Sequence, residues 1–214
     1  MGGDRRGGDP ELLPILGQPP RERSDAARNR DAVLCAAQQL VARDGVAAVT
    51  MDAVAEAAGV GKGTVFRRFG SRAGLMARLL DESEAAWQAA VISGPPPLGP
   101  GAPPRERLLA FGRSRLVSNL EKSDLLLAAT GDAPLASGAP QRSYAAYSFT
   151  ATHVRYLLGE IGVRGDIALL ATALLAPLEV PILLQQTTIE HMDVERILTG
   201  WEDLVDRVVG PAGP

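Results

Sequence analysis

Residues 50–69 have the sequence TMDAVAEAAGVGKGTVFRRF, in which two short segments with helical apolar spacing flank a glycine-containing turn. Thr50 is a suitable N-cap, and Asp52 in the first turn complements the helix dipole, so we expect a helix that ends at Gly59. A second helix is expected over 61–69. Two short helices joined at this spacing predict a helix-turn-helix.

The second of these helices has an inward and an outward face. Val65 and Phe69 lie one turn apart and are expected to face the core. Arg67 falls on the opposite face, where a guanidinium can donate two hydrogen bonds to a guanine edge, and Thr64 can offer a hydroxyl or a methyl group to a base. The expected groove-facing residues are Gly63, Thr64 and Arg67, with Phe66 and Arg68 on the flanks.

Charge is distributed unevenly along a chain whose net charge is −3. Residues 21–80 carry 10 basic and 6 acidic side chains, whereas residues 81–214 carry 10 and 16. A basic segment in an acidic protein is consistent with one surface that faces nucleic acid. Cations of this segment can neutralise backbone phosphates, helped by helix N-termini. The expected contacts outside the groove-facing set are Thr50, Lys62 and Arg72, with Arg68 also directed to phosphate.

The pattern T-M-x-x-V-A-x-x-A-G-V-x-K-G-T-V-F-R-R-F followed by S-R-x-x-L, within residues 25–80, resembles the DNA-binding signature of the TetR/AcrR family of transcriptional regulators. The resemblance implies a homodimeric repressor that a small-molecule ligand releases from a palindromic operator. The chain departs from the family pattern at two positions. Gly61 replaces the usual Ser, which removes a side-chain cap. Phe66 replaces the common Tyr, so Arg68 is expected to substitute for the lost phosphate contact, and plain packing of Phe66 is the alternative.

The remaining sequence predicts helices and no strands, because Ala and Leu dominate the apolar residues and aromatic residues make up only 4%. Six prolines and three glycines at 94–104 predict a stiff connection. The predicted fold is all-α, with about nine helices and three parts: a flexible arm at 1–22, a helix-turn-helix domain at 23–80 and a ligand-binding and dimerisation domain at 81–210. Outside the motif, helices are expected over 25–44, from Ser71 towards Trp87, over 105–129, 141–161 and 167–184, and from Asp193 onward.

The C-terminal part carries the expectations about partners. Residues 167–184 are apolar nearly all round and are expected to form one buried core helix. The final helix has an apolar stripe, so the last two helices predict a homodimer. Breaks at Pro177 and Pro181 favour imperfect packing and a site for an unidentified apolar small molecule. The nominated ligand contacts are Tyr144, Tyr147, His153 and Gln185.

Other classes of protein receive less support. One cysteine, Cys35, and two histidines provide neither a disulfide framework nor a metal site, and we expect no cofactor and no catalytic residue. Cys35 lies opposite the apolar stripe of its helix and is expected at the surface or at an interdomain contact. No signal peptide or membrane span is predicted, so a cytoplasmic location is expected. Two alternatives remain open: a carrier of apolar ligands that has lost DNA binding, and an enzyme built on a helical bundle.

Overall fold

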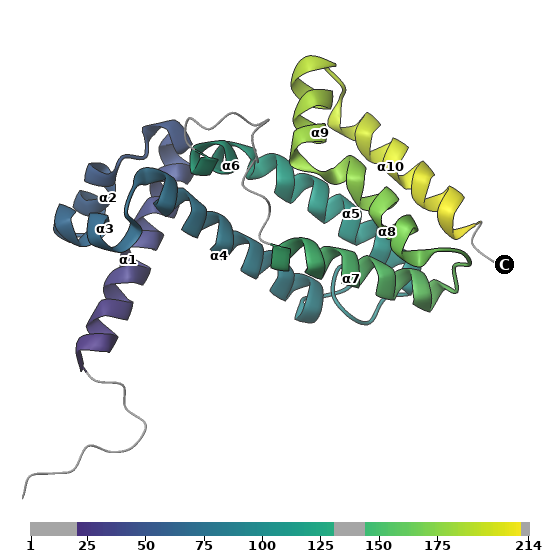
Figure 1. Cartoon of the computed structure of the whole chain (residues 1–214), viewed down its shortest axis with the longest axis horizontal. Coiled ribbons are helices and arrows are strands. Elements are labelled where there is room, and N and C mark those ends of the chain that lie inside the picture. The colour runs from purple at the N-terminus through teal and green to yellow at the C-terminus, as the bar shows by residue number, and fades with distance from the viewer. Residues whose placement is uncertain (1–20, 131–143, 211–214) are drawn as a thin grey trace, which may run out of the picture.

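The computed structural model describes residues 21–130 and 144–210, without the side chains of 21–27, 130 and 144–147. This part of the chain contains ten α-helices and no strand, which confirms the all-α prediction (Figure 1). Residues 1–20 of the expected arm lie outside the described residues. The helices are α1 (Arg21–Asp44), α2 (Met51–Ala57), α3 (Lys62–Phe69), α4 (Arg72–Ser93), α5 (Pro104–Glu121), α6 (Ser123–Thr130), α7 (Tyr144–Ile161), α8 (Ile167–Leu175), α9 (Val180–Leu184) and α10 (Val194–Val209), with a 3₁₀ turn, η1, at Val46–Ala48.

Buried apolar side chains form two separate clusters, and helix α4 contributes to both. Its first half supplies Leu75 and Leu79 to one cluster, and its second half supplies Trp87 and Val91 to the other. The N-terminal core consists of Val33, Leu34, Ala37, Leu40, Val49, Met51, Val54, Ala55, Val65, Phe69, Leu75, Met76 and Leu79. The C-terminal core consists of Trp87, Val91, Leu108, Phe111, Leu116, Val154, Leu157, Leu158, Ala171, Leu174, Leu175, Leu178, Leu183, Ile197, Trp201 and Val205.

Side-chain caps start four of the helices, including the cap at Thr50 that the sequence predicts. Thr50 accepts a hydrogen bond from the amide of Ala53 at 3.1 Å, and Ser71 accepts one from Gly74 at 3.1 Å. Asp166 and Asp193 do the same for α8 and α10 at 3.0–3.1 Å. Each cap satisfies a backbone donor that has no partner within its helix, which explains why the helices begin where they do.

The expectation of one buried helix over 167–184 is wrong. Helix α8 ends at Leu175, a 3₁₀ turn follows, and α9 begins at Val180 after a bend of 41°. Pro177 and Pro181 lack the amide hydrogen that a continuous helix requires, so the hydrogen-bond ladder breaks between them. The apolar surface is also incompletely covered within one chain, because Leu169 is 67% exposed and Ile182 is 40% exposed.

Two other helix boundaries differ from expectation. Helix α1 begins at Arg21, four residues earlier than expected. The helix expected over 105–129 is interrupted at Lys122, where α5 ends and α6 begins. The hydroxyl of Ser123 donates a 2.7 Å hydrogen bond to the carbonyl of Leu120, which satisfies an acceptor that the next helical amide would otherwise use.

No single described helix is both long and apolar enough to cross a membrane. The bent pair Ile167–Leu178 and Val180–Ile189 meets that test only when its two parts are taken together. Four leucines of this pair, Leu174, Leu175, Leu178 and Leu183, belong to the C-terminal core.

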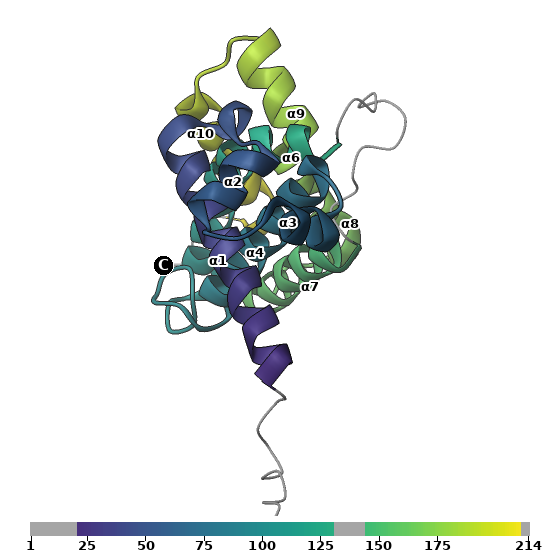
Figure 2. The same cartoon turned by 90° about the vertical axis from the view of Figure 1, so that its left-hand side faces the viewer.

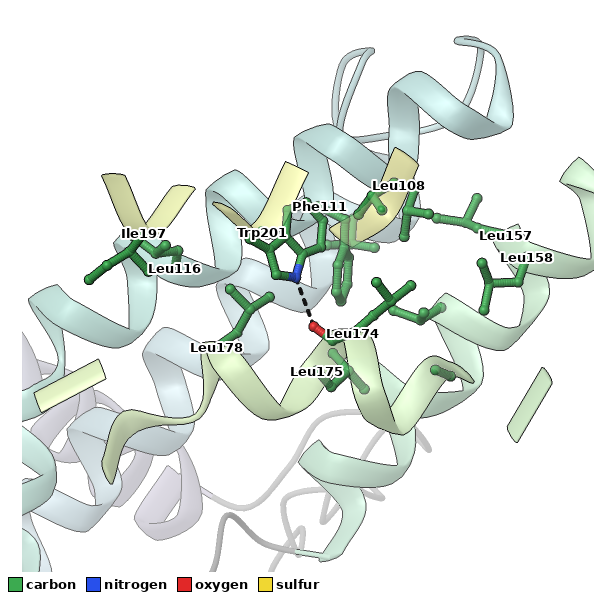
Figure 3. Packing of buried hydrophobic residues seen from close by; sticks show 14 of the residues in the cluster. Leu108, Phe111, Leu116, Leu157, Leu158, Leu174, Leu175, Leu178, Ile197 and Trp201 are labelled. Carbon is green, nitrogen blue, oxygen red and sulfur yellow. Dashed lines mark hydrogen bonds between the residues drawn. The ribbon is translucent and has the colours of Figure 1, made fainter. Parts of the chain in front are cut away.

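Trp201 attaches α10 to the C-terminal core. Its indole Nε1–H donates a 2.7 Å hydrogen bond to the carbonyl of Leu174, and Figure 3 shows the ring directed at that residue among the buried leucines. The ring also lies against Gly112 of α5, where a Cβ would overlap it. Ion pairs from α5 to α10 flank this contact, Arg105 with Asp206 and Arg113 with Glu202.

Candidate DNA-binding site

Helices α2 and α3 form the predicted helix-turn-helix, which occupies one end of the molecule (Figures 1 and 2). The turn between them depends on Gly59, whose φ of +65° lies in the left-handed region that favours glycine. After this turn the amide of Val60 donates a 3.0 Å hydrogen bond to the carbonyl of Ala55. Val54 of α2 and Val65 of α3 are fully buried in the N-terminal core, which holds the two helices against each other.

The exposed face of α3 carries the side chains that the sequence assigned to DNA. Gly63, Arg67 and Arg68 are exposed, and Thr64 is half-buried. A Cβ at Gly63 would meet no protein atom within 4 Å, so the open space above it faces outward. Phe66 is 47% exposed, and its ring is therefore not part of the N-terminal core.

Two of the nominated phosphate contacts already have a partner within the motif. Lys62, at the start of α3, forms an ion pair with Asp52 of α2. Thr50 uses its hydroxyl oxygen to cap α2. Both residues are exposed, and an exposed ion pair is weak enough for an ammonium group to turn to a phosphate.

Arg72 has a position that the sequence did not reveal. Its Nε donates to the carbonyl of Val49 at 2.7 Å, and its Nη2 donates to the carbonyl of Val46 at 2.5 Å. The half-buried guanidinium thus joins the first turn of α4 to the segment between α1 and α2. The sequence carries no signal for these bonds, because the acceptors are backbone atoms 23 and 26 residues away.

Replacing Arg72 by Ala is expected to lower the free energy of unfolding by about 1–3 kcal/mol, since the carbonyl of the buried Val49 loses its Arg72 donor and the carbonyl of Val46 keeps only the amide of Val49, at 3.2 Å. Affinity should fall on specific and nonspecific DNA alike, because the α2–α3 unit loses a support and a cation. Arg72→Lys keeps the charge but cannot make both bonds. Thermal unfolding and DNA titrations of the two variants test this. If Arg72→Lys had the stability and the DNA affinity of the wild type, only the charge of Arg72 would matter.

Of the four nominated ligand contacts, the described side chains are those of His153 and Gln185, and they lie on different elements. The side chains of Tyr144 and Tyr147 lie outside the described part. Gln185 is exposed, follows α9 and donates to Glu190 at 3.0 Å, whereas His153 lies on α7. Figure 1 places α9 at the top of the view and α7 below α5 and α8.

His153 has an environment of its own. The rings of Phe111 and Phe149 stack on its imidazole at centroid distances of 5.2 and 6.0 Å. Burial, and then the nearby positive charge of Arg107, lower the pKa of His153 to about 4. The imidazole is therefore neutral at pH 7.

Cys35 is exposed on α1, as predicted. Within residues 21–130 and 144–210, no group of three or more His, Cys, Asp or Glu side chains could hold a metal ion.

Comparison with known proteins supports this interpretation of the N-terminal part. The family model described as bacterial regulatory proteins, tetR family, matches residues 33–79, which contain α2 and α3. A search among curated proteins finds no match.

Solved structures are similar over the whole fold. A TetR-like transcriptional regulator from Rhodococcus sp. RHA1 is 21% identical, with 89% of this chain and 97% of that chain covered and a TM-score of 0.53. FadR of Thermus thermophilus, a TetR-family repressor solved with lauroyl-CoA, is 19% identical, with 86% and 97% covered and a TM-score of 0.54. A protein from Saccharomonospora viridis assigned to the transcriptional regulators and solved with choline is 20% identical, with 84% and 96% covered and a TM-score of 0.58.

The matched family model, the helix-turn-helix geometry over the same residues and the shared fold agree. Residues 33–79 therefore match the DNA-binding part of the tetR family of bacterial regulatory proteins, and the chain as a whole shares the fold of TetR-family structures.

Proposed function

We propose that this protein is a repressor that binds a palindromic operator through α3 and leaves it when an effector binds. The observation that carries the proposal is the outward face of α3, where Arg67 is exposed and makes no ion pair with a described residue. Gly63 beside it leaves room for DNA to approach the backbone. A helix with such a face, held by a buried opposite face, suits the major groove.

Each nominated residue has a separate task in this proposal. Arg67 donates to a guanine edge, Thr64 contacts a neighbouring base, and the exposed ring of Phe66 lies against a thymine methyl group or a sugar. Lys62, released from Asp52, and Arg68 bind phosphates. Thr50 and Arg72 contact phosphates at the ends of the motif while they hold α2 and α4 in position.

A mobility-shift assay on DNA from the promoter region of the protein's own gene tests the proposal. We expect a discrete complex that survives an excess of unrelated DNA and weakens as salt rises, because bound phosphates release counterions. Equal competition by unrelated DNA would contradict it. That result would favour the alternative of a ligand carrier that has lost sequence-specific DNA binding.

The proposed dimer buries the apolar surface that α8, α9 and the start of α10 leave exposed. Leu169 is 67% exposed, Ile182 40% and Val194 39%, and Ile189 between them is 72% exposed. A second copy of the chain, related by a two-fold axis, would cover these residues symmetrically. The same axis would place the two α3 helices in half-sites one DNA turn, or a multiple of it, apart.

Leu169→Glu is expected to convert the dimer to a monomer at micromolar concentration, because two carboxylates would be buried across the axis without partners. Light scattering measures the change, and circular dichroism checks that the helices persist. Ile92→Glu is the matched control, since Ile92 is 59% exposed on α4, away from α8 and α10. A monomeric wild type, or a dimer that survives Leu169→Glu, would contradict the assignment.

The effector is proposed to bind among the helices between residues 105 and 186 and to prefer the conformation that cannot bind DNA. The solved neighbours hold chemically different ligands, lauroyl-CoA and choline, which supports an organic ligand without indicating its class.

Linkage requires operator DNA to weaken effector binding by the factor by which the effector weakens operator binding. The compound to test is one that raises the melting temperature of the protein in a screen. We expect its affinity for the protein to be about 5–150-fold lower when operator DNA is bound, which corresponds to the usual range of coupling free energies. Calorimetric titrations in both conditions measure it. Equal affinities would rule out release by that compound.

A further inference from the structure

Arg107 is a half-buried cation without a described counter-charge. It lies near the start of α5, and its Nε is shielded from solvent and has no hydrogen-bond partner. No ion pair joins its guanidinium to any described acidic residue. An Nε–H group in this position is costly, because it has lost water without gaining an acceptor.

His153 has a buried polar atom of the same kind. Its Nε2 is shielded from solvent and has no partner. The imidazole is stacked between Phe111 of α5 and Phe149 of α7, and Tyr156, 52% exposed, lies at a centroid distance of 6.4 Å. This aromatic cluster thus extends from the shielded imidazole to the surface at Tyr156.

Arg107 and His153 are neighbours, and no nearby acidic side chain among the described residues balances the positive charge of Arg107. Arg107 lies one helical turn before Phe111, on whose ring the His153 imidazole stacks at 5.2 Å, and its positive charge contributes to the lowered pKa of His153. The other buried cation of this region, Arg115, is bonded to Glu84 at 2.7 Å and lies 4.4 Å above the Trp87 ring. The carboxylate of Glu84 balances the charge of Arg115, so it does not supply the acceptor that Arg107 lacks.

We propose that Arg107 and His153 receive the carboxylate of an apolar organic acid, with Phe111 and Phe149 against its apolar body. This inference rests on the proposed function, because it names the class of the effector. One carboxylate oxygen accepts from the Nε–H of Arg107, and the other accepts from the Nε2–H of His153. The bound anion cancels the repulsion between the guanidinium and a protonated imidazole.

Other ligand classes fit these residues less well. A cation would face Arg107 at short range, in spite of the aromatic rings that could otherwise stack on it. An alcohol has one oxygen and no charge, so it would leave the guanidinium uncompensated. The acid is thus the class that satisfies both orphaned nitrogens.

The first test compares matched ligands on the full chain without DNA. Calorimetry at pH 7 uses 4-phenylbutyrate and octanoate, each against the alcohol and the amine of the same carbon skeleton. We expect each acid that binds to do so at least about tenfold more tightly than its alcohol, and no binding of the amines. Arg107→Gln should abolish the preference for acid. Arg164→Gln, which changes an exposed arginine in the loop before α8, should keep it.

The second test follows the proton on His153. The chain has only two histidines, so the imidazole NMR signals are assigned by the loss of one signal in His153→Gln. A bound acid should raise the pKa of His153 from about 4 by at least about one unit, since one unit corresponds to a tenfold preference for the protonated form. The alcohol should leave it unchanged. Arg107→Gln should prevent the response to acid.

The outcomes separate this inference from the proposed function. Equal binding of acid and alcohol, binding of neither, or a preference for acid that survives Arg107→Gln would overturn the inference. Such a result leaves release from DNA by another compound intact. An acid that binds through Arg107 and yet leaves operator affinity unchanged would support the inference and contradict effector-controlled release by that acid.

Discussion

Arg67→Ala is expected to reduce affinity for the operator by about 1–3 kcal/mol per half-site, which is the usual value of one bidentate contact to a base. The reason is the position of Arg67 on the outward face of α3, opposite the buried Val65 and Phe69. Affinity for unrelated DNA should change much less, because a base contact contributes only to the matching sequence. Fluorescence anisotropy with both DNAs, at one fixed salt concentration, measures the difference.

Arg78→Ala is the matched control for this experiment. Arg78 lies in the same basic segment but on α4, where it is exposed and bonded to Asp81 at 3.1 Å. Removing this side chain should leave the ratio of the affinities for operator and for unrelated DNA unchanged. If Arg67→Ala instead weakened both DNAs equally, Arg67 would be a phosphate contact and the base-reading role would pass to other residues of α3.

Trp201→Ala is expected to lower the free energy of unfolding by about 3–5 kcal/mol, the usual cost of removing a large aromatic side chain from a core. The indole is 3% exposed and lies between α5 and α8. Because Gly112 has no side chain to occupy the space, the variant leaves a cavity that neighbours cannot easily fill. Urea unfolding at a fixed protein concentration measures the loss, since dimerisation would also contribute to stability.

Two further variants separate packing from hydrogen bonding at this site. Trp201→Phe keeps an aromatic ring but removes the donor to the Leu174 carbonyl, so it should cost less than Trp201→Ala. Asp203→Ala changes an exposed residue of the same helix and should have little effect. A loss below about 1 kcal/mol for Trp201→Ala would mean that α10 is not held by this contact.

Local patterns in the sequence were sufficient to predict the helix-turn-helix. The caps at Thr50 and Ser71, the glycine turn and the spacing of Val65 and Phe69 act over a few residues, so they can be interpreted without the rest of the chain. The outward face of α3 follows from the same helical period. For this reason the candidate DNA contacts on α3 could be named before the fold was known.

Contacts between distant segments could not be predicted in this way. Arg72 bonds to carbonyls of Val46 and Val49, and backbone acceptors leave no trace in side-chain patterns. The bend between α8 and α9 is of the same kind, because apolar composition does not distinguish a continuous helix from a bent pair, even where Pro177 and Pro181 interrupt the run.

The sequence by itself determined the helical class, the helix-turn-helix and the residues on the outer face of its second helix, because these depend on short-range periodicity and capping. Only the tertiary structure decided how side chains from separate helices meet. Arg107 and His153 are 46 positions apart, and their shared lack of partners depends on the packing of α5 against α7. Burial and pairing depend on the whole fold, since they record what surrounds each atom rather than what precedes it in the chain.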